Sequence, residues 1–141
     1  MQRSALKLVP MIVLLTLACG GDDEPFSPTV KDVAGSYQAS SLTGTQSGIT
    51  VNLLSLGATV AIVLNEDLTT TGRVFAPGLD ENGQDLDVDL TGTWTLQGET
   101  VTFNQTGDTF IRDIPFTVGR NRLQGEGTFN TITVRLTLTK E

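Results

Sequence analysis

The chain has 141 residues, with sixteen acidic side chains, nine basic ones, a formal net charge of −7 and no histidine. This acidic balance argues against a nucleic-acid-binding protein, which needs a basic face. Histidine is the commonest general base and metal ligand, and no glycine-rich phosphate loop is present, so we expect neither an enzyme nor a resident cofactor. A single cysteine, Cys19, excludes a disulfide within the chain.

The first eighteen residues have the pattern of a signal peptide. Arg3 and Lys7 form a positively charged region, and residues 8–18 form an apolar core. A transmembrane helix needs about 20 apolar residues. This run ends after about a dozen, the length of a signal-peptide core, so a membrane span is the weaker interpretation.

The end of that apolar run resembles the lipobox of bacterial lipoproteins, with the sequence Leu15-Thr16-Leu17-Ala18-Cys19. The resemblance implies that the peptide is cut before Cys19, which becomes the acylated N-terminus and carries chains such as palmitate. Each buried methylene contributes about 0.8 kcal/mol, so several acyl chains anchor a small domain firmly to a bilayer. By the family's sorting rule, Gly20 implies the outer membrane, facing the periplasm, rather than the inner one. A plain secretory signal with a free cysteine is the alternative.

Residues 19–31 are interpreted as the lipidated cysteine and a flexible tether, and residues 32–141 as the single folded domain. The tether is rich in glycine, acidic residues and proline, which cannot bury a core. After cleavage, residues 19–141 carry seven cations and sixteen acids, a formal balance of −9. Such a chain has no overall attraction to an anionic lipid surface, so we expect the acyl anchor alone to hold it on the membrane.

Short segments of alternating apolar and polar residues begin at residue 35 and predict strands joined by polar turns. The clearest segment covers residues 85–96, where Leu86 and Trp94 share the apolar face and Asp87 the wet one. Residues 47–57 fit either a ninth short strand or one or two helical turns that end at Gly57 and lie across a barrel end. The eight predicted strands cover residues 35–43, 58–64, 69–76, 85–96, 100–105, 110–118, 122–129 and 131–138.

Eight sequential antiparallel strands with one apolar face each predict an all-β fold, an eight-stranded up-and-down barrel without exposed edges. A two-sheet β-sandwich is the alternative. Side chains just fill the interior of an eight-stranded barrel, or leave room for one small ligand.

Three phrases make the domain similar to the lipocalin-like, calycin-type domains of bacterial lipoproteins. They are Val33-Ala34-Gly35-Ser36-Tyr37, Leu90-Thr91-Gly92-Thr93-Trp94-Thr95-Leu96 and Gly98-Glu99-Thr100-Val101-Thr102-Phe103. Lipocalins place Gly-x-Trp on the first strand, packed near an arginine of the last strand. Here Gly35 and Tyr37 replace that motif, and Arg135 is the corresponding cation, although alternation puts it on the wet face. The resemblance implies a barrel that binds a small apolar or lipid-like molecule.

Arg112 is the candidate polar anchor for such a ligand. Alternation through 110–118 places its guanidinium on the apolar face, where it could bind the carboxylate of a lipid. Phe110, Phe116, Trp94 and Val101 would then surround the apolar tail. The alternatives are an arginine that extends outward and pairs with a carboxylate, or a bulge before Pro115 that shifts the register.

The acidic segment 80–89 is a candidate calcium site, because calcium takes six to eight oxygen ligands. Its donors would be Asp80, Asn82, Asp85 and Asp87. The glycine of this segment does not stand where an EF-hand requires it, and the other interpretation is a solvated acidic face that opposes edge aggregation.

The sequence therefore predicts a membrane-anchored envelope lipoprotein that binds or carries a small apolar ligand. The alternative is a structural or protein-interaction lipoprotein with a filled barrel. A hollow interior would favour the first function, and a solid core would favour the second.

Overall fold

The computed structural model of the chain describes residues 26–78, 82–107, 109–129 and 131–141. The predicted signal peptide, the predicted lipobox with Cys19, and the predicted tether up to residue 25 lie outside the described residues, as does Asp80. Within the described ranges, no helix combines the length and the apolar character needed to cross a membrane.

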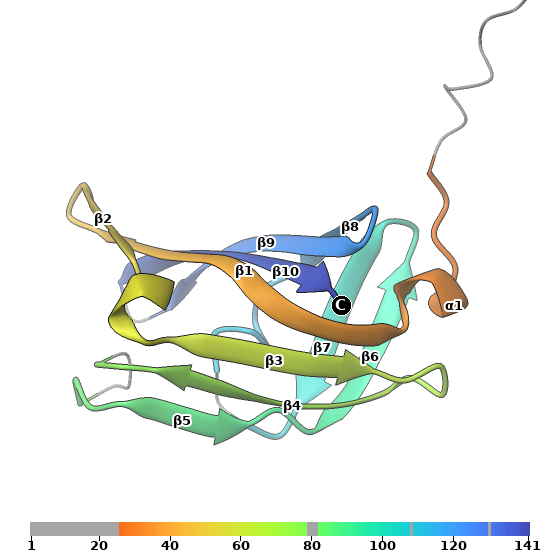
Figure 1. Cartoon of the computed structure of the whole chain (residues 1–141), viewed down its shortest axis with the longest axis horizontal. Coiled ribbons are helices and arrows are strands. Elements are labelled where there is room, and N and C mark those ends of the chain that lie inside the picture. Colours follow the sequence, from red (N-terminus) through yellow and green to blue (C-terminus); the bar gives the residue numbers. More distant parts are fainter. Residues whose placement is uncertain (1–25, 79–81, 108, 130) are drawn as a thin grey trace, which may run out of the picture.

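Eight antiparallel strands close into a barrel (Figure 1). In order around the barrel they are β1 (Gly35–Gln46), β3 (Thr59–Leu64), β4 (Thr69–Ala76), β6 (Gly92–Gln97), β7 (Thr100–Gln105), β8 (Phe116–Gly119), β9 (Arg122–Phe129) and β10 (Ile132–Lys140). Closure is made by β1 and β10, which pair from Tyr37–Lys140 to Thr45–Thr133. The predicted all-β barrel is therefore confirmed, and the sandwich alternative is wrong.

Residues 47–57 contain both of the structures that the sequence left open. Strand β2 (Ile49–Asn52) forms a hairpin with the end of β1, and the 3-10 helix η1 (Leu54–Leu56) follows it. Gly57 ends η1 with φ of 100°, a left-handed conformation that favours glycine.

The predicted strand 85–96 is divided in two. Strand β5 (Leu86–Asp89) and β6 both pair with β4, and the register continues from Arg73–Asp89 to Thr70–Gly92. Between them the amide of Leu90 donates to the carbonyl oxygen of Gly72. A Cβ at Gly92 would collide with the backbone of β7, so glycine permits the close approach that brings β6 alone against β7.

The predicted strand 110–118 is wrong over its first half, because only Phe116–Gly119 is a strand. The preceding residues form turns whose side chains enter the barrel, and Phe110, Ile111 and Ile114 are buried. Ile114 occupies the space that Gly125 and Gly127 of β9 leave open, since a Cβ on either glycine would overlap the Ile114 side chain. This segment closes part of the interior with apolar side chains.

The strand ends define two ends of the barrel. The proximal end holds helix α1 (Val30–Val33), where the described chain enters, together with the β3–β4, β6–β7 and β8–β9 turns. The distal end holds the β1–β2 hairpin, η1 and the turn after β4 (Figure 1). Thr29 caps α1 in a capping box with Asp32.

Candidate functional site

The interior of the barrel is filled. Trp94, Val101 and Phe116 have no exposed surface and Phe110 has 1%, so the structure brings together the four side chains that were predicted to surround a ligand tail. These side chains pack against other core residues; for example, the ring of Phe116 packs edge-on against that of Phe103, with centroids 5.4 Å apart. A ligand among these residues would have to displace the core.

Arg112 lies at the edge of the core rather than within it. Its side chain keeps 36% of its surface exposed, and its Nε lies 3.4 Å from Oδ1 of Asp113. The alternation that placed it beside Phe110 and Phe116 does not hold, because residues 110–113 form turns and the strand begins only at Phe116. The arrangement matches the outward-extending, carboxylate-paired arginine more closely than a buried anchor.

The distal end carries an open apolar pocket of about 330 Å³, called the mouth below. It is lined by Gly44, Gln46, Ile49, Val51, Leu53, Leu56, Pro77, Gly78 and Ile132. The volume lies at the lower end of the range of small-molecule pockets.

The mouth is a continuation of the inner face of the barrel. Gly44 is opposite Val134 of the core on one side and Val51 on the other, and Gln46 is opposite Ile49. Because residues directly opposite one another share a face, Ile49 and Val51 extend the core surface beyond the rim. Solvent reaches them there, with 68% of Ile49 and 39% of Val51 exposed.

Local sequence explains why the hairpin projects so far. Ser47 and Gly48 both have positive φ, 51° and 80°, as a two-residue hairpin turn of the primed type requires. The hydroxyls of Thr45 and Thr50 are 2.8 Å apart across the hairpin. The side-chain oxygen of Asn52 then accepts from the amide of Leu54 at 3.1 Å, which turns the chain into η1.

The described lining of the mouth is apolar. No charged side chain among the described residues lines it, and the most polar of them, Gln46, donates its amide to Thr131 Oγ1 at 3.0 Å. Three of the five exposed large apolar residues of the described chain, Ile49, Val51 and Leu56, line this one pocket. A gathering of exposed apolar residues of this kind makes the mouth a candidate binding site.

Sequence reasoning did not find the mouth. The alternation of Ile49, Val51 and Leu53 with polar residues was visible, and it predicted a strand as one of two possibilities. The apolar partners Pro77 and Ile132 come from turns and strands far away in the chain, and only the fold brings them together.

Two described members of the acidic segment, Asp85 and Asp87, make structural contacts. Asp87 forms a two-pronged pair with Arg73, with both nitrogen–oxygen distances 2.7 Å, and this hydrogen bond lowers the pKa of Asp87. Asp85 accepts from the amide of Gly78 at 3.3 Å. Across the described ranges, no three His, Cys, Asp or Glu side chains are grouped to hold a metal ion; Asp80 lies outside them.

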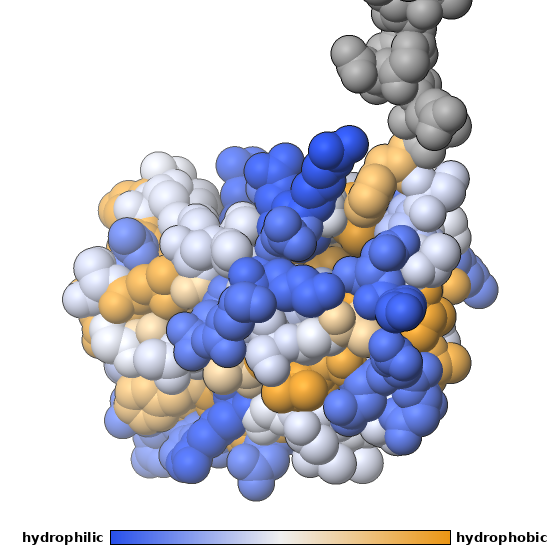
Figure 2. Space-filling model, turned by 45° about the vertical axis from the view of Figure 1, so that its right-hand side comes forward, coloured by the Kyte–Doolittle hydropathy of each residue, from blue (hydrophilic) through white to orange (hydrophobic). Residues whose placement is uncertain are grey.

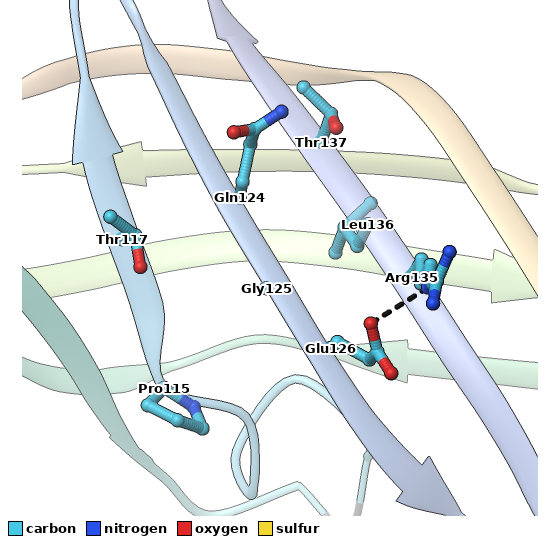
Figure 3. A pocket seen from close by; sticks show the side chains of 8 residues that line it. All are labelled: Pro115, Thr117, Gln124, Gly125, Glu126, Arg135, Leu136 and Thr137. Carbon is cyan, nitrogen blue, oxygen red and sulfur yellow. Dashed lines mark hydrogen bonds and ion pairs between the residues drawn. The ribbon is translucent and has the colours of Figure 1, made fainter.

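Arg135 lies on the outer surface, as alternation predicted. Figure 3 shows it on β10, paired through Nε with Oε2 of Glu126 on β9 at 2.7 Å. The two residues line a polar surface groove of about 410 Å³ with Thr117 and Gln124. Arg135 is opposite Thr43, whereas Tyr37 is buried near the other end of β1, so this arginine does not pack against the first-strand motif.

Two buried polar side chains have no hydrogen-bond partner among the described residues. They are Gln105, with both its amide nitrogen and its oxygen unpaired, and Thr109, with its hydroxyl unpaired. Gln105 is 4% exposed at the end of β7, and Thr109 is fully buried at the start of the turn segment. Such groups destabilise a fold unless something pairs with them.

Comparison with known proteins found no significant match to this chain among protein-family models, curated proteins or solved structures.

Proposed function

We propose that the protein is an envelope lipoprotein, anchored through Cys19, whose lipocalin-like barrel binds a small apolar ligand at its distal mouth. The observation that carries this proposal is the pocket of about 330 Å³ lined by solvent-exposed Ile49, Val51 and Leu56. Because no described residue of the lining is charged, the favoured ligand is an uncharged apolar molecule or the hydrocarbon portion of a lipid-like one.

The filled core limits how such a ligand binds. Burial of apolar surface supplies about 25 cal/mol per Å², and at the mouth this surface is available without unpacking Trp94 or Phe110. The ligand would therefore sit at the rim, partly exposed, and would exchange quickly. This geometry suits a carrier that hands on its ligand.

A fluorescence titration with the neutral probe N-phenyl-1-naphthylamine tests the mouth. Every helix and strand of the described chain lies between Val30 and Lys140, so the chain from residue 20 onward contains this fold and avoids the acylated cysteine. We expect Leu56→Gln and Ile49→Thr each to weaken probe binding at least tenfold, about 1.4 kcal/mol. Both side chains are exposed, so the free energy of unfolding should change little.

The matched control is Leu68→Asn. Leu68 is also an exposed leucine, at 38%, but it lies in the β3–β4 turn at the proximal end. The substitutions Leu68→Asn and Arg112→Ala should both leave probe binding unchanged. Equal weakening by Leu68→Asn would show that the probe binds exposed apolar residues without selecting the mouth. Selective loss in Arg112→Ala would favour a site around that arginine instead.

The second candidate function is a structural or protein-interaction lipoprotein, and the filled core favours it. Under this function the exposed apolar residues of the mouth would contact apolar side chains of a protein. A wild-type domain that binds neither the probe nor fatty alcohols would support this alternative and contradict the carrier.

The anchor has its own test. Metabolic labelling with a fatty-acid probe should mark the wild-type protein, and Cys19→Ser should abolish the label and leave an unprocessed or soluble form. Undiminished labelling of the mutant would contradict the assignment of Cys19.

A further inference from the structure

The cations of the folded domain are divided between two kinds of position. Three of the seven have carboxylate partners on or near the barrel wall: Arg73 with Asp87, Arg135 with Glu126, and Arg112 with Asp113. The other four are Lys31 of α1, Arg120 and Arg122 of the β8–β9 hairpin, and Lys140 at the end of β10. All four belong to the proximal end, and none forms an ion pair with any described residue.

Three of these four cations line one surface hollow. Lys31, Arg120 and Lys140 surround a volume of about 570 Å³, and Asp32 is the only carboxylate among the described residues that line it. Its Oδ2 is already occupied at the start of α1, where it accepts from the amide and the hydroxyl of Thr29, each at 2.9 Å. The described residues of the hollow therefore carry a local excess of positive charge in a strongly acidic protein.

The backbone holds one of these cations, Lys140, in place. The ammonium of Lys140 donates to the carbonyl oxygen of Asp32 at 2.9 Å, and its stem crosses Gly35, where a Cβ would lie 2.5 Å from Lys140 Cε. Glycine has the same role beneath Arg122, because a Cβ on Gly119 would lie 2.8 Å from Arg122 Nε. Glycine therefore leaves room for the path of both side chains across the barrel end.

The chain itself places this hollow close to the proposed anchor. Phe26 lines it and is 37% exposed, and it follows Cys19 by seven residues. Seven residues span at most about 25 Å. Figure 2, with the proximal end turned forward, shows hydrophilic residues gathered beside the point where the chain enters the domain.

We propose that this hollow binds the phosphate of a phospholipid headgroup in the membrane that holds Cys19. Lysine and arginine are the side chains that bind phosphate oxygens, by charge-assisted hydrogen bonds. The barrel would then stand with its proximal end against the bilayer and its mouth directed away from it. This inference rests on the anchor of the proposed function.

Acidic side chains at the same end limit the contact to the hollow. Glu66, Asp67 and Glu99 lie in the β3–β4 and β6–β7 turns at this end, so a uniformly anionic surface would be repelled as well as attracted. We therefore expect recognition of single headgroups, not adhesion of the whole end. The proposal therefore adds a headgroup contact to the acyl anchor, which the sequence predicted to hold the protein on the membrane by itself.

The test is an NMR titration of residues 20–141 with dihexanoylphosphatidylglycerol below its micelle concentration, and in parallel with inorganic phosphate. We expect saturable shifts of the Lys31, Arg120 and Lys140 amides with the lipid. The double variant Lys31→Gln/Arg120→Gln should weaken this binding at least fivefold. The matched control, Arg73→Gln/Arg135→Gln, removes the same charge from the barrel wall and should bind like wild type.

Each other outcome contradicts the proposal in a different way. Equal affinity for inorganic phosphate would identify a free-phosphate site, and equal weakening in the control would indicate general charge attraction. An absence of shifts at this end with either compound would exclude the site. Because residues 20–141 do not include Cys19, the result is independent of acylation. Lipid tails bound at the mouth would shift the amides of residues 49–56 instead.

Discussion

Trp94 is the residue whose replacement tests the fold most directly. Its side chain is fully buried, and its indole nitrogen donates to the carbonyl oxygen of Asn65 at 3.0 Å. Its backbone amide donates to the carbonyl oxygen of Leu68 at 2.9 Å. The side chain therefore fills the core and also ties β6 to the β3–β4 turn.

Truncation to alanine should cost about 3–5 kcal/mol, the range for removing a large aromatic side chain from a packed core. Loss of the bond to Asn65 adds about 1 kcal/mol, while the amide bond to Leu68 is kept. Trp94→Phe retains most of the ring volume, so we expect it to lose considerably less stability.

Urea denaturation followed by circular dichroism measures these changes, because Trp94 is the sole tryptophan and its fluorescence disappears in the variant. The neighbouring Thr93 is exposed on the outer face, so Thr93→Ala should stay within about 0.5 kcal/mol of wild type. A loss below about 1 kcal/mol in Trp94→Ala would refute the assignment of this face to the core.

Three further changes test other parts of the structure. Gln105→Met should raise the free energy of unfolding in urea, because it removes two buried unpaired polar atoms; destabilisation would reveal a hidden partner. Burial raises the pKa of Tyr37 to about 12, so stability should fall as pH rises above 10, where the unfolded phenol ionises, and Tyr37→Phe should remove that decline. The hydrogen bond from Arg73 lowers the pKa of Asp87 below 3.8, so the pair stabilises above that pH and the contribution is lost on acidification. Asp87→Asn should therefore flatten the acid side of the stability–pH profile.

The sequence by itself determined the bounds of strands that are joined to the preceding strand by a short polar turn. Strands β4, β7 and β9 begin and end where alternation and turn residues predicted, with polar turns at residues 65–68, 97–99 and 119–121. Alternation is a local property, since a strand with one buried face must place an apolar residue at every second position. The same pattern predicted that Trp94 faces inward and Arg135 outward.

Only the tertiary structure decided how the barrel is filled and what its ends present. Turns at residues 110–113 replace a predicted strand because Gly125 and Gly127 leave space that Ile114 fills from inside, a relation that no local pattern contains. The mouth and the proximal cations likewise gather residues from opposite ends of the sequence. Periodicity shows which face of a strand is buried, but barrel closure determines which residues share a rim, and there the candidate sites lie.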